Sequence, residues 1–185
     1  MTLSARPLAA AVLALGLAAA PALAGEQPIG QPIEKNGMNV IGVYLQPVVM
    51  QPAMADQDAK KTDIHLEADI KALKDNPNGF SEDSWIPYLT VDYTIAKRGT
   101  DWKTSGALHA MVASDGPHYG ANVALNGPGQ YDVTFRIAPP GTDAHGHTAV
   151  FLRHTDKETG VQGWWKPFEF RGDFKFVGTG KKGGY

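Results

Sequence analysis

Apolar and polar residues alternate strictly along the stretch Ile64-His65-Leu66-Glu67-Ala68-Asp69-Ile70. Successive side chains of a β-strand point to opposite faces, so the apolar residues share one face and the polar residues share the other. This pattern predicts a half-buried strand. Its polar face then presents three side chains that can titrate or bind a metal: His65, Glu67 and Asp69.

The rest of the chain also favours β-structure. Its 21 Gly and 13 Pro interrupt it often, and the segments between these breaks are apolar or β-branched, as strands are. The further expected strands are residues 40–45, 85–95, 108–113, 131–137, 148–152 and 165–170. Short strands separated by turns predict an all-β protein, an immunoglobulin-like β-sandwich that forms a single domain.

The first 24 residues are expected to be a secretory signal peptide. Arg6 precedes an apolar stretch over residues 7–20, and Ala22-Leu23-Ala24 offers the small residues that a signal peptidase recognises. We therefore expect export from the cytoplasm and a folded domain over residues 25–185. An uncleaved membrane anchor is the alternative, but the apolar stretch is short against the roughly 20 residues that a bilayer-spanning helix needs.

The composition narrows the class of function. Cysteine is absent, so no disulfide stabilises the fold and any metal site must use other ligands. A formal net charge of −2 without a basic run argues against binding to nucleic acid or to an anionic membrane surface. The chain also lacks a nucleophile elbow, a phosphate-binding glycine loop and the His-Glu-x-x-His motif of zinc proteases.

The histidines are the strongest candidates for metal binding, because imidazole is the commonest metal ligand in proteins. The six are His65, His109, His118, His145, His147 and His154. On one strand, His65 and Glu67 project to the same side, so that an imidazole and a carboxylate can reach one metal ion or two neighbouring ions. An isolated His-x-Glu is more often a solvated strand face, which is the alternative interpretation.

Met111 and His118 form a second candidate pair. They are separated by a turn expected at Asp115-Gly116-Pro117, which can bring His118 back toward the strand that carries Met111. A lone methionine is usually core filler. Thioether sulfur, however, selects Cu(I), and imidazole binds both oxidation states of copper, so the pair favours copper over zinc, iron or calcium. His109 shares the strand face of Met111 and either joins that site or packs beside it.

The other histidines lie beside turns. His154 precedes a polar, hairpin-like turn over residues 155–160 and, taken alone, is a surface histidine. His145 and His147 flank Gly146 in a glycine-rich loop. That pair can chelate a metal weakly. The alternative is that the two histidines simply lie at the tip of a loop.

Several segments together resemble one protein family, the periplasmic iron-uptake proteins that accompany a bacterial oxidase-dependent iron permease. The similarity runs from Gly25 almost to the C-terminus. The segments are Gly25-Glu26-Gln27-Pro28-Ile29-Gly30, Val43-Tyr44-Leu45-Gln46-Pro47, residues 63–70, residues 111–122, and Arg153-His154 through Trp165.

The resemblance implies a periplasmic homodimer that binds copper and supplies iron to an inner-membrane permease. The copper ligands it implies are His65, Met111, His118 and His154. It places Glu67 beside the copper at a second metal position, with Asp115 and Glu26 as neighbours. A carboxylate is a hard ligand that suits iron, or manganese as its surrogate. No ligand of the family corresponds to His109, His145 or His147.

We therefore expect a metal-binding transport accessory protein rather than an enzyme. In this hypothesis copper accepts an electron from adjacent iron, and the oxidised iron passes to the permease. A periplasmic copper chaperone or buffer without an iron role is the main alternative. An adhesive sandwich with incidental histidines is another. A catalytic oxidase is disfavoured, because such enzymes use several copper sites and this is one small domain.

Overall fold

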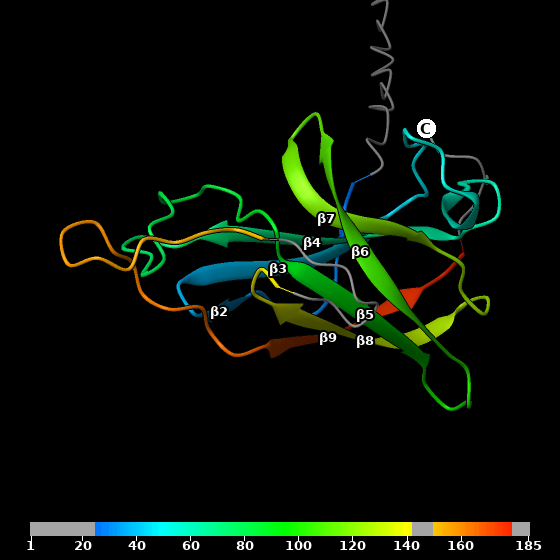
Figure 1. Cartoon of the computed structure of the whole chain (residues 1–185). Coiled ribbons are helices and arrows are strands. Elements are labelled where there is room, and N and C mark those ends of the chain that lie inside the picture. Colours follow the sequence, from blue (N-terminus) through cyan, green and yellow to red (C-terminus); the bar gives the residue numbers. More distant parts are fainter. Residues whose placement is uncertain (1–24, 142–149, 179–185) are drawn as a thin grey trace, which may run out of the picture.

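The computed structural model describes residues 25–141 and 150–178. Its regular structure there consists of nine β-strands and one short 3₁₀-helix, η1 (Ala55–Gln57) (Figure 1). The same residues include no helix with the length and hydrophobicity that a membrane crossing demands. The strands are β1 (Gln27–Pro28), β2 (Ile33–Lys35), β3 (Met38–Leu45), β4 (Ile64–Ala72), β5 (Thr90–Lys97), β6 (Lys103–Ala113), β7 (Gly116–Val123), β8 (Gly129–Ala138) and β9 (Phe168–Phe176).

All strand pairings are antiparallel, and β6 belongs to two sheets. The first sheet has the order β1-β3-β4-β7-β6, with β2 also paired to β3. The second has the order β6-β5-β8-β9. Residues 103–108 of β6 pair with β5, whereas residues 109–113 pair with β7. Figure 1 shows β6 running diagonally from one sheet to the other.

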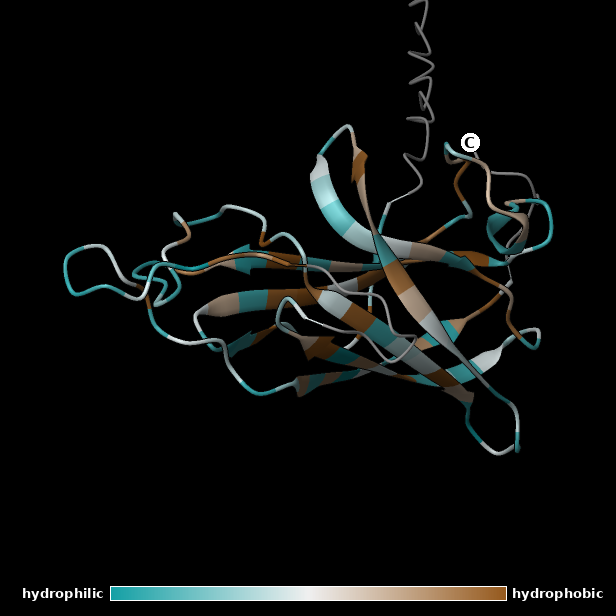
Figure 2. Cartoon of the chain, viewed as in Figure 1, coloured by the Kyte–Doolittle hydropathy of each residue, from teal (hydrophilic) through white to brown (hydrophobic). Residues whose placement is uncertain are grey.

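The core lies between the inner faces of the two sheets. The apolar residues of β4 are at most 2% exposed, and alternate residues of β8 from Tyr131 to Ile137 are at most 1% exposed. Brown and teal alternate along these strands in Figure 2, as period-2 patterning requires. Close sheet-to-sheet packing is evident at Gly42 of β3, where a Cβ atom would lie 2.9 Å from the ring of Phe170 on β9. The predicted all-β immunoglobulin-like sandwich is confirmed.

Four of the expected strands lie inside observed ones, and three expectations need correction. Residues 85–89 are not part of β5, because Pro87 and the positive φ of Tyr88 (61°) keep them from extending the ladder. Strand β9 begins at Phe168 rather than at residue 165. Residues 150–152 form no strand, and residues 148 and 149 lie outside the described part of the chain, as do the expected signal peptide and His145 and His147.

Three strands were missed: the short β1 and β2, and the longer β7. The turn after Met111 is tighter than expected, since Ala113 already pairs with Gly116. Chain reversal therefore occurs at residues 114–115, and the expected turn residues Gly116 and Pro117 begin β7. This strand places His118 directly opposite Met111.

Candidate metal centre

The polar faces of β4, β7 and β6 meet on the side of the first sheet that faces away from the sandwich core. Cross-strand pairing aligns Glu67 of β4 with Gly120 of β7, and Gly120 with His109 of β6. In the neighbouring rows His65 pairs with Asn122, and Met111 pairs with His118. Because side chains two residues apart on a strand share a face, all of these groups are on the same face of the sheet.

This face is not solvated. His65, Glu67 and His118 are 1%, 5% and 4% exposed. The segment that follows β3 covers them, and Val48 and Gln57 of that segment form hydrogen bonds to Asn122. The interpretation of His65-x-Glu67 as an open strand face is therefore wrong.

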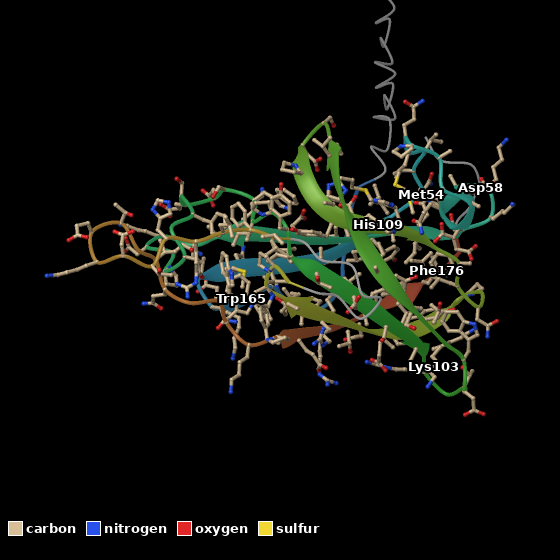
Figure 3. All side chains as sticks on the ribbon, viewed as in Figure 1. Met54, Asp58, Lys103, His109, Trp165 and Phe176 are labelled. Carbon is tan, nitrogen blue, oxygen red and sulfur yellow. The ribbon has the colours of Figure 1, made fainter. Side chains whose placement is uncertain are left out.

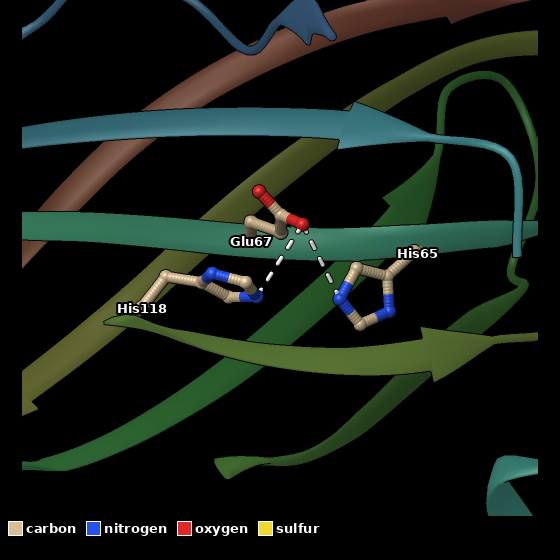
Figure 4. Close-up of side chains that lie close together, drawn as sticks. All are labelled: His65, Glu67 and His118. Carbon is tan, nitrogen blue, oxygen red and sulfur yellow. Dashed lines mark ion pairs between the residues drawn. The ribbon is translucent and has the colours of Figure 1, made fainter. Parts of the chain in front are cut away.

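The three buried groups converge on one point. The Oε1 atom of Glu67 lies 3.4 Å from Nε2 of His65 and 3.4 Å from Nε2 of His118. One ligand atom from each residue lies within 4.8 Å of the others. Figure 4 shows both imidazoles turned toward the same carboxylate oxygen. The arrangement can hold a single metal ion with two nitrogen ligands and one oxygen ligand.

Asn122 fixes the orientation of His65. Its Oδ1 lies 2.9 Å from Nδ1 of His65, while its Nδ2 donates to the carbonyl oxygens of Val48 and Gln57. Two carbonyl acceptors define which end of the amide is nitrogen, so Oδ1 is an acceptor and Nδ1 of His65 must carry the proton. The lone pair of His65 is then on Nε2 and points at Glu67, as a metal-binding imidazole requires.

Both inward-facing nitrogens lack a hydrogen bond. Within the described residues, Nε2 of His65 and Nε2 of His118 are buried polar atoms without such a partner. Burial without a partner costs free energy, so such atoms call for a function. A metal ion between them would satisfy both.

Gly120 makes room for a sulfur ligand. A Cβ atom at this position would lie 2.7 Å from Nε2 of His65 and 3.1 Å from Sδ of Met111. The thioether therefore lies beside the imidazole above the bare backbone of Gly120. Met111, His118 and Glu67 line one cavity of about 720 Å³. Its donor set of two imidazoles and a thioether fits copper.

Further carboxylates surround Glu67. Burial, and to a lesser extent the negative charges of Asp69, Glu26 and Asp115, raise the pKa of Glu67 to about 8. The pKa of Glu26 is also raised, first by burial and then by Asp69 and by Asp115, with which it shares a hydrogen bond. Burial lowers the pKa of His65 to about 4, so its imidazole is neutral at pH 7. A bound cation would relieve the crowding of acidic groups.

The structure brings together most of the predicted site residues but not His154. Glu26, Met111, Asp115 and His118 line the cavity with His65 and Glu67, and so does His109. The side chain of His154 is 73% exposed, and its Nδ1 lies 2.7 Å from Oγ1 of Thr159. Among the described residues, His154 is not part of the cavity lining.

Sequence reasoning missed Asn122, Met50 and Met54. Asn122 is two residues beyond Gly120 on the face of β7 that carries His118, so a strand predicted over residues 116–123 would have identified it. The two methionines lie in the covering segment and line the same cavity. No local pattern in the sequence marks them.

Comparison with known proteins identifies the family. The family model described as Fe²⁺ transport protein matches residues 23–178. The chain belongs to the Fe²⁺ transport protein family. The resemblance inferred from the sequence is thereby confirmed. Membership in a transport family also agrees with a transport accessory role.

Similarity to known proteins covers most of the chain. A UPF0423 protein of Brucella abortus (strain 2308) is 49% identical over 178 residues, which are 96% of each chain. The copper-reconstituted P19 protein from Campylobacter jejuni is 49% identical with a TM-score of 0.77, over 85% of this chain and 99% of that one. FetP of uropathogenic E. coli strain F11, expressed in the E. coli periplasm, is 49% identical with a TM-score of 0.76, over 83% and 97% of the two chains.

Proposed function

We propose that this member of the Fe²⁺ transport family is a periplasmic iron-uptake protein that holds copper at the buried cavity. The observation that carries the proposal is the pair of buried Nε2 atoms of His65 and His118, both without hydrogen bonds and both 3.4 Å from Glu67. Copper-reconstituted P19 and periplasmically expressed FetP, at 49% identity, support it.

Each residue of the cavity has a distinct role. The imidazoles of His65 and His118 bind either oxidation state of copper, and the thioether of Met111 favours Cu(I). Copper bound by this mixed set supplies a one-electron acceptor for iron. Asn122 keeps Nε2 of His65 free to bind, and Gly120 leaves the space that ligands need.

Glu67 and its neighbours favour an iron role over copper storage alone. The charges of Asp69 and Asp115 help to raise the pKa values of both Glu67 and Glu26, so the four carboxyl groups lie close together. Copper held by imidazole and thioether does not need four carboxyl groups, whereas Fe(II), Fe(III) and Mn(II) prefer oxygen ligands. Iron would therefore bind on the Glu67 side, with manganese as its surrogate.

A second copy of the chain would supply His154. This histidine precedes a turn within the segment 150–165, which projects beyond the ends of the sheets (orange in Figure 1). Exposed apolar residues accompany it, with Val150 66% and Leu152 86% exposed. A protein interface over this segment would cover these apolar side chains. In a two-fold homodimer the segment 150–165 of each copy can reach the cavity of the other copy, so that each cavity gains the imidazole of one His154.

Substitution of Glu67 by glutamine distinguishes iron uptake from a copper chaperone or buffer. Iron uptake predicts that Glu67→Gln retains copper but loses binding of iron or manganese in titrations. It also predicts that cells with the variant grow poorly on limiting iron, because the permease is no longer supplied. Copper binding and iron-limited growth equal to wild type would favour the buffer.

The redox step has its own test. Copper-loaded protein is expected to oxidise Fe(II) faster than the same concentration of free copper. If it does not, the protein binds both metals without transferring an electron.

A further inference from the structure

A second set of soft ligands lies in the cavity, apart from the buried His65 and His118. Met50 and Met54 come from the segment between β3 and β4, and His109 comes from β6. Met54 is 42% exposed and so reaches the surface. Figure 3 shows Met54 and His109 on the same side of the molecule, near the crossing of β6 over the first sheet.

Met54 and His109 also line a neighbouring cavity of about 820 Å³. Gln57 and Ala110 are the other residues that the two cavities have in common. Met54 and His109 thus belong to the wall that the two cavities share, and the cavity of about 720 Å³ is also lined by Glu67. An ion that approaches the buried ligands from this side meets them first.

His109 is available as a ligand. It pairs with Gly120, which pairs on its other side with Glu67. Two strand spacings separate His109 from Glu67, roughly 10 Å between backbones, and His109 is not part of the convergent group of His65, Glu67 and His118. No hydrogen bond or ion pair of His109 occurs within residues 25–141 and 150–178, where the structure is described.

The chemistry of the set selects one ion. Exposed methionine is uncommon, since a flexible thioether is usually buried. Thioether sulfur with imidazole favours Cu(I) over Cu(II), zinc or iron. We propose that Met50, Met54 and His109 form an entry site that captures Cu(I) and passes it to the buried ligands. The transfer step depends on the proposed function, but capture of Cu(I) by the entry site does not.

A Cu(I) competition experiment tests capture. The protein with His65→Gln and Met111→Leu, in which the buried site is disabled, is titrated anaerobically with Cu(I) against a chromophoric chelator. We expect one equivalent of Cu(I) to remain bound, and the addition of Met54→Leu and His109→Gln to weaken it at least tenfold. Absence of Cu(I) binding in the disabled protein, or binding unchanged by the added substitutions, would overturn the proposal.

Two further measurements keep the test independent of folding and of the proposed function. Met38→Leu makes the same chemical change at a core methionine that lines neither cavity, and is expected to change nothing. With an intact buried site, Met54→Leu with His109→Gln should slow stopped-flow loading of Cu(I) about tenfold; an unchanged rate would refute the entry role. If the entry site binds Cu(I) but the buried site does not, the proposed function is contradicted and the proposal of the entry site is not.

Discussion

Replacement of Glu67 by glutamine should change how the stability of the metal-free protein depends on pH. Glu67 is 5% exposed, and its pKa is raised from 4.5 to about 8, chiefly by burial and then by Asp69, Glu26 and Asp115. Glutamine has nearly the same shape as the protonated carboxyl and does not titrate. The variant therefore removes the titration while it preserves the packing.

The sign and size of the effect follow from the raised pKa. The folded state holds the proton more tightly than the unfolded state, so Glu67 stabilises the protein below pH 4.5 and this contribution is lost as the pH rises through 8. His65 acts in the opposite sense, because its lowered pKa makes stability rise between pH 4 and 6.5. Above pH 6.5 the carboxyl dominates, and the loss between about pH 6.5 and 9 is roughly 2 kcal/mol at about 1.4 kcal/mol per pKa unit.

Urea denaturation of chelator-treated protein at the two pH values measures the effect. Wild type should lose roughly 2 kcal/mol more unfolding free energy than Glu67→Gln between about pH 6.5 and 9. Glu34→Gln, at an exposed position on β2, serves as the matched control and should follow wild type. The reasoning is refuted if wild type and Glu67→Gln lose stability in parallel.

Other predictions concern the geometry around the metal. Asn122→Ala should weaken copper binding about 10- to 100-fold in a chelator competition, because it frees the ring of His65; an unchanged affinity would show that Asn122 does not position it. Gly120→Ala should lower copper affinity and should destabilise the protein by about 1–3 kcal/mol, seen as a lower melting temperature. Gly163→Ala, where a Cβ atom would make only an ordinary contact 3.8 Å from Nη2 of Arg153, should do neither. Leu152→Asp should give monomers in sedimentation and weaken copper binding as much as His154→Ala does; a dimer that remains intact would contradict the interface.

The sequence predicts the strand that carries the site but not the strand that completes it. The alternation from Ile64 to Ile70 is a local, period-2 signal, and it correctly placed His65 and Glu67 on one face. Strand β7 begins with Gly116 and Pro117, residues that normally indicate a turn, so its ladder could not be recognised from local pattern. Strands β4 and β7 are neighbours in the sheet although they lie about 50 residues apart in the sequence. A periodic pattern within either strand does not predict this pairing.

The sequence also did not predict that the site is buried. The face that carries His65 and Glu67 is polar, and polar strand faces are usually solvated. It is buried because the segment after β3 folds back over it and forms hydrogen bonds to Asn122. That contact depends on irregular backbone. The raised pKa of Glu67 and the two unpartnered imidazole nitrogens follow from it.

Anomalous diffraction at the copper edge from copper-loaded crystals tests the central claim most directly. We predict one buried anomalous peak bounded by Nε2 of His65, Nε2 of His118 and Sδ of Met111, with Glu67 beside it. Absence of a peak at this position while exposed His154 binds copper in its place would contradict the assignment of the buried cavity as the copper centre.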